Sequence, residues 1–144
     1  MNAMHHPSAV DQGLRAHNLS VVDRHMRNEA IDPDSVMSLY TDDAVLEIPA
    51  RGLRFDTLAA IRDNYVRMFA SMSEVAIHPM DRFATDDRVV DECMVTLRIV
   101  GDGVTGAPLP IGTRAELRLL HVFHMRDGRI AREEVFEAWR RLEG

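Results

Sequence analysis

Two ionisable residues near the C-terminus, His121 and Glu133, are of the types needed for proton transfer. Each lies in an extended run and shares its side of that run mainly with apolar residues. A carboxyl group in apolar surroundings has a raised pKa, and a histidine titrates near neutral pH. Together they suit removal of a proton beside a carbonyl, or loss of water from a β-hydroxy carbonyl compound.

Both residues also have a purely structural interpretation. His121 can be a core histidine that bonds to a neighbour. Glu133 can form an ion pair with Arg132 or Arg129 at the mouth of a pocket. The sequence leaves both interpretations open.

A second candidate pair, His25 and Glu29, has i, i+4 spacing within a helical pattern, so both lie on one helix face. The alternative is a helix-surface hydrogen bond. Tyr40 and Tyr65 fit core positions, although a buried phenol needs a partner and can orient a ligand. We count all four as pocket candidates. A metal site of His25, Glu29 and His121 is possible by residue type, but the spacing does not require it, and we expect neither a metal nor a cofactor.

A predicted β-hairpin positions His121 and Glu133. Asp127-Gly128 between two alternating runs is a strong signal for a tight turn. The mostly apolar face of this hairpin carries Leu117, Leu119, His121, Phe123 and Met125 of the first run and Ala131, Glu133, Val135, Glu137 and Trp139 of the second. We therefore expect Phe123 and Val135 to lie in the same pocket wall as the two ionisable residues.

Helices are predicted before the long strands, from residue 13 to about 31, from 33 to about 40, and from 58 to about 72. Asp32 is a suitable N-cap with Pro33 in the first helical position, and Asp56 or Thr57 can cap the third helix. Residues 1–12 are polar and patternless, and we expect a flexible tail there.

Extended runs are predicted at residues 44–48, 75–84, 88–100, 111–125 and 129–139. Helices followed by a meander of antiparallel strands indicate the α+β class. Three helices on one face of a strongly curved, mixed but mainly antiparallel sheet would form a cone-shaped barrel over a pocket. We expect a single domain over residues 13–144.

Composition excludes several classes of function. The net charge of −6 argues against nucleic acid and anionic membranes as partners. No apolar segment approaches the roughly 20 residues of a membrane span, and no signal-peptide pattern is visible. Cys93, the single cysteine, fits a reducing compartment, so we expect a cytoplasmic protein.

Several short segments, in order along residues 15–139, resemble those of a known family. They are His25-Met26-Arg27-Asn28-Glu29 with Asp32, Leu39-Tyr40-Thr41-Asp42-Asp43-Ala44-Val45 with Pro49, Asp87-Arg88-Val89-Val90, Gly112-Thr113-Arg114, and residues 123–130. The sequence resembles the SnoaL-like branch of the nuclear-transport-factor-2-like superfamily. That resemblance implies a deep, largely apolar pocket with acid–base side chains and no cofactor. The superfamily includes ester cyclases, ketosteroid isomerases, an epoxide hydrolase, dehydratases and non-catalytic binding domains, and the fold does not choose among them.

The resemblance also bears on individual positions. It implies that Glu47 of the first strand points inward, and in the enzyme hypothesis Glu47 is a second acid or base that His25 positions. The alternative is an ion pair of Glu47 with Arg51 or Arg54. Where the cyclases and the epoxide hydrolase have an aspartate in the last strand, this chain has Val135.

Cys93 and Val95 stand where the epoxide hydrolase has its middle-strand Arg and Asp. Those mechanisms therefore do not transfer literally, although we expect both residues to line the pocket.

We thus expect an acid–base enzyme of the isomerase, cyclase or dehydratase type that acts on a small apolar carbonyl compound, with His121, Glu133 and Glu47 as proton-transfer groups. The alternative is a non-catalytic domain that holds an apolar ligand. Either is compatible with a homodimer through the outer sheet face, which carries Met94, Leu120, Val122 and Phe136.

Overall fold

Strands β5 (Arg114–Arg126) and β6 (Arg129–Arg141) form the predicted hairpin. Asp127 and Gly128 have φ of 53° and 74°, so both turn residues are left-handed, as a two-residue turn of type I′ requires. The pairing sets Val135 opposite His121 and Glu133 opposite Phe123. The hairpin therefore brings the inward residues of both strands to one face.

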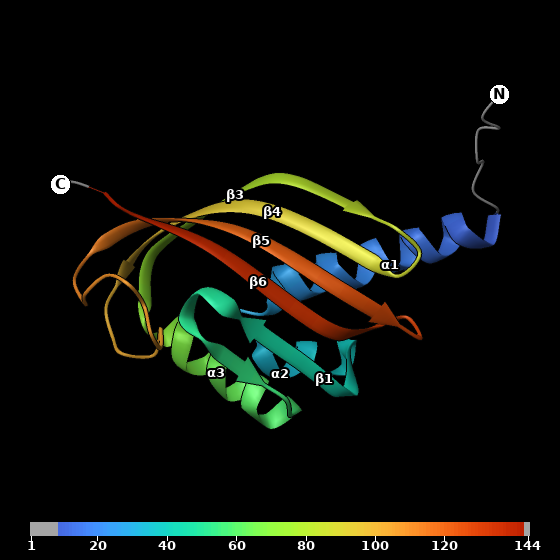
Figure 1. Cartoon of the computed structure of the whole chain (residues 1–144), viewed down its shortest axis with the longest axis horizontal. Coiled ribbons are helices and arrows are strands. Elements are labelled where there is room, and N and C mark those ends of the chain that lie inside the picture. Colours follow the sequence, from blue (N-terminus) through green and yellow to red (C-terminus); the bar gives the residue numbers. More distant parts are fainter. Residues whose placement is uncertain (1–8, 143–144) are drawn as a thin grey trace.

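The structure is a computed structural model and describes residues 9–142 (Figure 1). The remaining elements are α1 (Ala9–Asn28), α2 (Pro33–Val36), a 3₁₀ turn (Met37–Leu39), β1 (Tyr40–Ile48), a second 3₁₀ turn (Pro49–Arg51), β2 (Leu53–Phe55), α3 (Leu58–Ala70), β3 (Met72–Ala84) and β4 (Arg88–Ile99).

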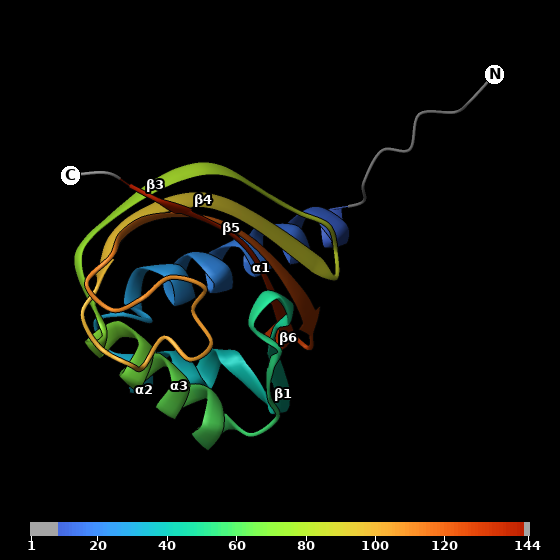
Figure 2. The same ribbon diagram turned by 60° about the vertical axis from the view of Figure 1, so that its left-hand side comes forward.

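One sheet of six strands has the order β2-β1-β6-β5-β4-β3. Only the β1–β6 pair is parallel, so the sheet is mixed and mainly antiparallel, as predicted. The strands arch over α1, and α2 and α3 lie on the same side of the sheet (Figures 1 and 2). The predicted α+β architecture is confirmed.

The helix ends follow local capping. The Asp32 side chain accepts from the backbone N–H of Ser35 at 3.4 Å, and Pro33 begins α2. Thr57 caps α3 by accepting from the N–H of Ala60 at 3.1 Å. Helix α1 begins at Ala9, inside the predicted tail of residues 1–12, and residues 1–8 lie outside the described part of the chain.

Tyr40 was predicted at the end of a helix and instead begins β1, four residues before the predicted strand. It pairs with Ile130 of β6, and the register of the two strands shifts between Tyr40 and Val45. Long-range pairing thus overrides the local pattern of the Thr41-Asp42-Asp43 segment.

Strand β3 forms one edge of the sheet, and it is irregular. Its pairing with β4 shifts register between Ser73 and Ala76 and again between Pro79 and Asp81, and Glu74 has a φ of 53°. The opposite edge is the short strand β2. No helix in the described part of the chain is long and apolar enough to span a membrane.

Two groups of buried apolar side chains form the core between sheet and helices. The larger joins α1, α3, β1 and the turn end of the β5–β6 hairpin, and includes Val22, Ile61, Leu46, Phe123 and Ile130. The smaller lies against β4 and β5 and consists of Cys93, Val95, Leu97, Ile99 and Leu117. The cavity described next is lined by residues of both groups.

Candidate functional site

A cavity lies between the concave face of the sheet and the helices α1 and α3. The volume open to the centre of a water molecule is about 80 Å³. One water needs roughly 10–15 Å³ in this measure, so the cavity has room for several waters or a small ligand. Apolar side chains make up most of its wall, and the polar residues in it are Glu29, Arg51, Asn64, Tyr65, His121, Glu133 and Glu137.

Glu133 is held by two phenols at the floor of this cavity. The hydroxyls of Tyr40 and Tyr65 donate to Glu133 Oε2 at 2.8 and 2.7 Å, and all three side chains are buried. Oε1 accepts no hydrogen bond from the described residues and so remains available to a ligand. The alternative that Glu133 pairs with Arg132 or Arg129 is not what the structure shows.

His25 links this cluster to Glu29. Its Nε2 lies 2.7 Å from the Tyr40 hydroxyl, which already donates to Glu133, so we assign the hydrogen to Nε2. Its Nδ1 lies 3.3 Å from Glu29 Oε2 without hydrogen-bond alignment. The expected His25–Glu29 pair therefore exists, and it leads into the buried cluster rather than across the helix surface.

Burial dominates the electrostatics of this cluster. It lowers the pKa of His25, an effect that Glu133 partly opposes. It raises the pKa of Glu29 well above its ordinary value, and the nearby Glu133 and Asp91 add to the shift. Burial also raises the pKa of both tyrosines well above the ordinary range. The phenols are therefore donors, and burial favours the protonated form of Glu29 relative to an exposed carboxyl.

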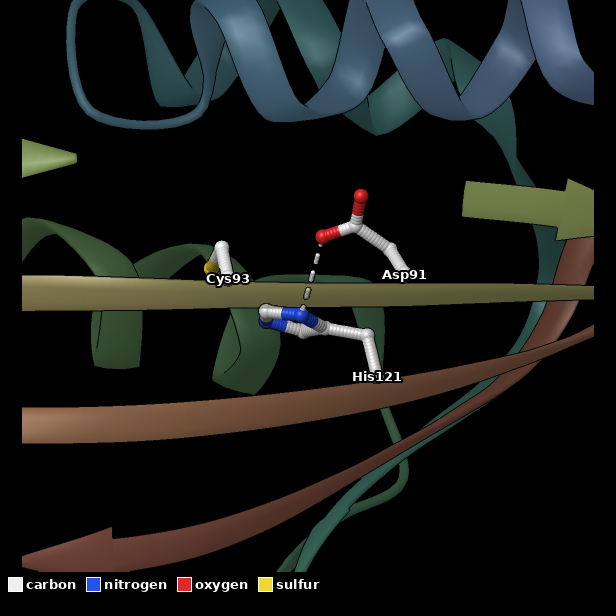
Figure 3. A group of neighbouring side chains, drawn as sticks. All are labelled: Asp91, Cys93 and His121. Carbon is white, nitrogen blue, oxygen red and sulfur yellow. Dashed lines mark ion pairs between the residues drawn. The ribbon is translucent and has the colours of Figure 1, made fainter. Parts of the chain in front are cut away.

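His121 faces a carboxylate that is not among the site residues predicted from the sequence. Asp91 lies directly across the β4–β5 pairing, and its Oδ2 is 3.5 Å from His121 Nδ1 (Figure 3). The imidazole stacks on Phe123 with ring centroids 5.8 Å apart and an interplanar angle of 14°. Nδ1 thus faces Asp91, and Nε2 has no hydrogen-bond partner among residues 9–142.

Arg82 fixes the Asp91 carboxylate from the side of β3. Its Nε donates to Asp91 Oδ1 at 2.7 Å, and its Nη1 donates to Asp23 Oδ1 of α1 at 3.2 Å. Burial acts to raise the pKa of Asp91, but the facing His121 and Arg82 outweigh it and leave the pKa below its ordinary value. Asp91 is therefore ionised at neutral pH.

A buried ion pair occupies another part of the cavity wall. Arg51 Nε donates to Glu137 Oε1 at 3.0 Å, and both side chains are nearly fully buried. The indole N–H of Trp139 donates to the same oxygen at 3.2 Å. Glu137 lies on the predicted inward face, whereas Arg51 comes from a turn for which the sequence gives no direction.

The structure places most of the predicted pocket residues in the cavity wall: His121, Glu133, Glu29, Tyr65, Cys93, Val95 and Val135. His25, Tyr40 and Phe123 lie behind that wall and support it. Burial raises the pKa of the Cys93 thiol to about 12, so this residue is a neutral thiol at physiological pH.

The expectation that Glu47 points inward is wrong. The inward positions of β1 are the buried Ala44, Leu46 and Ile48, so Glu47 has the opposite parity. It lies on the outer face and binds Arg132 at 2.9 Å and Arg54 at 3.4 Å. Glu47 is therefore not a candidate for proton transfer in the cavity.

Donor atoms suitable for a metal ion gather in two groups among the described residues. One is His25, Glu29 and Glu133; the other is Asp91, Cys93 and His121. Within each group the donor atoms all lie within 4.8 Å of one another. The trio considered from sequence, His25, Glu29 and His121, is not one of these groups.

Structural comparison gives many similar folds at low sequence identity. A phenazine biosynthesis-related protein from Pseudomonas aeruginosa superposes with a TM-score of 0.75 at 19% identity, over 94% of this chain and 83% of that one. A protein described as a SnoaL-like polyketide cyclase, from Jannaschia sp. CCS1, gives 0.73 at 15% identity, over 93% and 91%. An epoxide hydrolase of the LEH-like kind from M. tuberculosis gives 0.64 at 19% identity, over 86% and 84%.

Among curated proteins no sequence match is found. Residues 13–133, however, match the SnoaL-like domain family, and this range includes every residue of the Glu133 and His121 clusters. The order of helices and strands and the six-stranded curved sheet agree with that match. The chain belongs to the SnoaL-like domain family, within the nuclear-transport-factor-2-like fold.

Proposed function

We propose that this protein is an acid–base enzyme of the isomerase, cyclase or dehydratase type, in which side chains transfer protons on a small apolar carbonyl compound. The observation that carries the proposal is the environment of Glu133. One carboxylate oxygen is bound by two phenolic hydroxyls, and the other is left for a ligand in an apolar cavity. A base fixed in this way needs no rearrangement when substrate enters.

Glu133 is the proton acceptor in this proposal. Its carboxylate removes a proton from the carbon beside the carbonyl, and the electron pair of the broken C–H bond moves to the carbonyl oxygen. His121, in the same wall, stabilises the developing negative charge by donating from Nε2. The Asp91 carboxylate lies opposite Nδ1, so Nε2 is the ring nitrogen left for this donation.

The second half of the reaction decides the product class. Return of the proton from Glu133 to a different carbon completes an isomerisation. Departure of a β-hydroxyl, with the proton from His121, releases water and completes a dehydration. Attack of the enolate carbon on a second carbonyl of the same molecule closes a ring.

The comparisons support this type of chemistry without selecting one reaction. Structures that share the fold include a polyketide cyclase and an epoxide hydrolase by description. Val135 takes the place of the aspartate that the family resemblance attaches to those two activities. The proton-transfer role therefore falls to Glu133, two residues earlier on the same face of β6.

The test is exchange of the C–H hydrogens beside the carbonyl for deuterium in D₂O, followed by NMR on a panel of small cyclic and open-chain apolar ketones. It needs no knowledge of the natural product. We expect the wild-type protein to accelerate exchange for at least one ketone and Glu133→Gln to lose about 100- to 10,000-fold of the rate, the usual contribution of a general base. Glu134→Gln is the matched control, because Glu134 is adjacent on β6 but pairs with His124 on the outer face.

A binding domain without turnover is the second candidate, and the largely apolar cavity wall with Val135 in it favours this alternative. Ketones that bind without any accelerated exchange would support it and would refute the enzyme. Equal exchange rates for wild type and Glu133→Gln would instead refute the assignment of the base.

We also propose that two copies pair through the outer sheet face. Leu120 and Phe136 are direct cross-strand neighbours on that face, and Phe136 is 41% exposed. A two-fold arrangement would cover both. In the same proposal the protein is cytoplasmic, because its single cysteine is a buried free thiol.

A further inference from the structure

Asp91, Cys93 and His121 bring three different metal-ligating atoms together at the cavity wall (Figure 3). All three side chains are buried. Asp91 Oδ2 and His121 Nδ1 face each other, yet neither has a hydrogen-bond partner among the described residues. At 3.5 Å the two atoms form an ion pair only if the imidazole carries a proton on Nδ1, and a cation bound between them is the alternative that would satisfy both.

The separation of these two atoms fits a shared metal ion. They are 3.5 Å apart, which is longer than an N–H···O hydrogen bond. Zinc bonds of ~2.0–2.1 Å to nitrogen and oxygen and ~2.3 Å to sulfur place tetrahedral ligand atoms roughly 3.3–3.6 Å from one another. Cys93 Sγ is within 4.8 Å of both other donors, so a small side-chain rotation completes the set.

We propose that Asp91 Oδ2, Cys93 Sγ and His121 Nδ1 form a zinc site with an open fourth position. An imidazole, a thiolate and a carboxylate together are a donor set that zinc prefers. Zinc displaces the thiol proton, so the Cys93 S–H bond breaks, an S–Zn bond forms and one H⁺ is released. The two anionic ligands then neutralise the 2+ charge of the ion.

The surroundings hold the ligands as metal sites usually do. Arg82 binds the remaining oxygen of Asp91 at 2.7 Å and is itself bound to Asp23, so the carboxylate cannot turn freely. The ring of His121 is fixed by its stacking on Phe123. The competing group of His25, Glu29 and Glu133 is a poorer candidate, because two tyrosine hydroxyls already occupy Glu133 Oε2.

The site also has a way in and a place for a ligand. Asp91 and Cys93 line a second, open groove of about 580 Å³ between α1 and β3, through which an ion can enter. Cys93 and His121 line the inner cavity, so the open fourth position is directed there. This inference goes beyond the proposed function, since zinc on Nδ1 leaves the Nε2 donation of His121 in place and adds a cation that a ligand in the cavity can bind.

Metal binding is tested on the whole chain without any substrate. The background carries His5→Gln and His6→Gln to remove adventitious binding by neighbouring histidines. We expect titration calorimetry to show one Zn²⁺ per chain and Co²⁺ to give a tetrahedral spectrum with a thiolate charge-transfer band. Cys93→Ser abolishes that band, His121→Gln abolishes binding at concentrations that saturate the parent, and Arg82→Met weakens it about 10- to 100-fold.

His124→Gln and Glu92→Gln are the matched controls, because these residues neighbour the ligands but lie on the outer face in pairs with Glu134 and Arg118. Absence of Zn²⁺ binding by the parent, a Co²⁺ adduct without the thiolate band, or equal affinity in Cys93→Ser would each overturn the site. The Co²⁺ spectrum of the parent protein tests for the Cys93 ligand even where a ligand variant fails to fold. Ketone exchange by a protein that shows no Zn²⁺ binding in these titrations would leave the proposed function standing while the metal site fails.

Discussion

The Tyr65 hydroxyl donates to Glu133 Oε2 at 2.7 Å and so connects helix α3 to strand β6 inside the core. Tyr40 of β1 donates to the same oxygen at 2.8 Å. The carboxylate therefore ties together three elements that are far apart in the sequence. Both the stability of the fold and the position of the proposed base depend on these two bonds.

Replacement of Tyr65 by Phe removes one of the two donors and keeps the ring. We expect a loss of about 1–3 kcal/mol in the free energy of unfolding, because a buried carboxylate loses a hydrogen bond. Urea denaturation measures it. Tyr40→Phe should cost a similar amount, and the double variant should cost more than the sum of the two, since Oε2 then has no phenol donor. A change within about 0.5 kcal/mol in both single variants would contradict this account.

The raised pKa of Glu29 predicts a pH-dependent stability. In the window between the ordinary carboxyl pKa and the raised value, the folded state binds more protons than the unfolded state. The contribution of Glu29 is therefore fully present below the ordinary carboxyl pKa and is lost as pH rises through the folded value. His25, whose pKa is lowered, contributes the opposite slope below its ordinary value.

Glu29→Gln separates the two effects. We expect the difference in the free energy of unfolding between wild type and this variant to shift in favour of the variant as pH rises. Urea denaturation at intervals of about one pH unit, from about pH 4 upward, measures this difference. Glu74→Gln, at an exposed carboxylate, is the control and should show no comparable trend. A parallel pH dependence of wild type and Glu29→Gln would rule out the buried, protonated state.

The Arg51–Glu137 pair predicts a large cost for removal of one partner. Arg51→Met leaves Glu137 buried without its cation, and we expect a loss of about 3–5 kcal/mol. The double variant Arg51→Met, Glu137→Leu should recover most of this loss, because no buried charge then remains. Thermal and urea unfolding measure both. Equal destabilisation in the single and the double variant would show that packing, and not the unpaired charge, is responsible.

Phe136→Glu should convert the proposed dimer to a monomer. A carboxylate at the centre of an apolar contact would lose its hydration on association, which costs several kcal/mol. Sedimentation velocity at micromolar concentration gives the answer, and Ile31→Glu is the control because Ile31 is exposed in the turn between α1 and α2. A wild-type protein that sediments as a monomer would refute the dimer directly.

Much of the fold follows from local patterns in the sequence. Asp127-Gly128 fixes the turn, and alternation along β5 and along β6 beyond Arg132 fixes which face of the hairpin is buried. The register shift beside the turn interrupts this alternation and buries Ile130 in place of the predicted Ala131. For that reason the inward direction of His121 and Glu133 could be predicted. The start of β1 at Tyr40 could not be predicted, because it depends on pairing with Ile130, which is about 90 residues away in the sequence.

The candidate site was harder to predict than the fold. Asp91 shares its parity with Cys93 and Val95, so it could have been assigned to the inner face, but its partner is fixed only by the register of β4 and β5. The prediction for Glu47 was wrong because a shift of one residue along a strand moves a side chain from the core face to the solvent face. Contacts between elements, unlike alternation within one, leave no trace in a single sequence.

The irregular edge of the sheet bears on how copies of this chain can meet. Pro79 has no N–H to offer, and the register shift beside it bends β3 where a foreign strand would have to align. The other edge, β2, is only three residues long. Both edges of the sheet therefore disfavour the addition of further strands. A concentrated or partly aggregated preparation should lack cross-β order, and any association should end in closed oligomers of defined size.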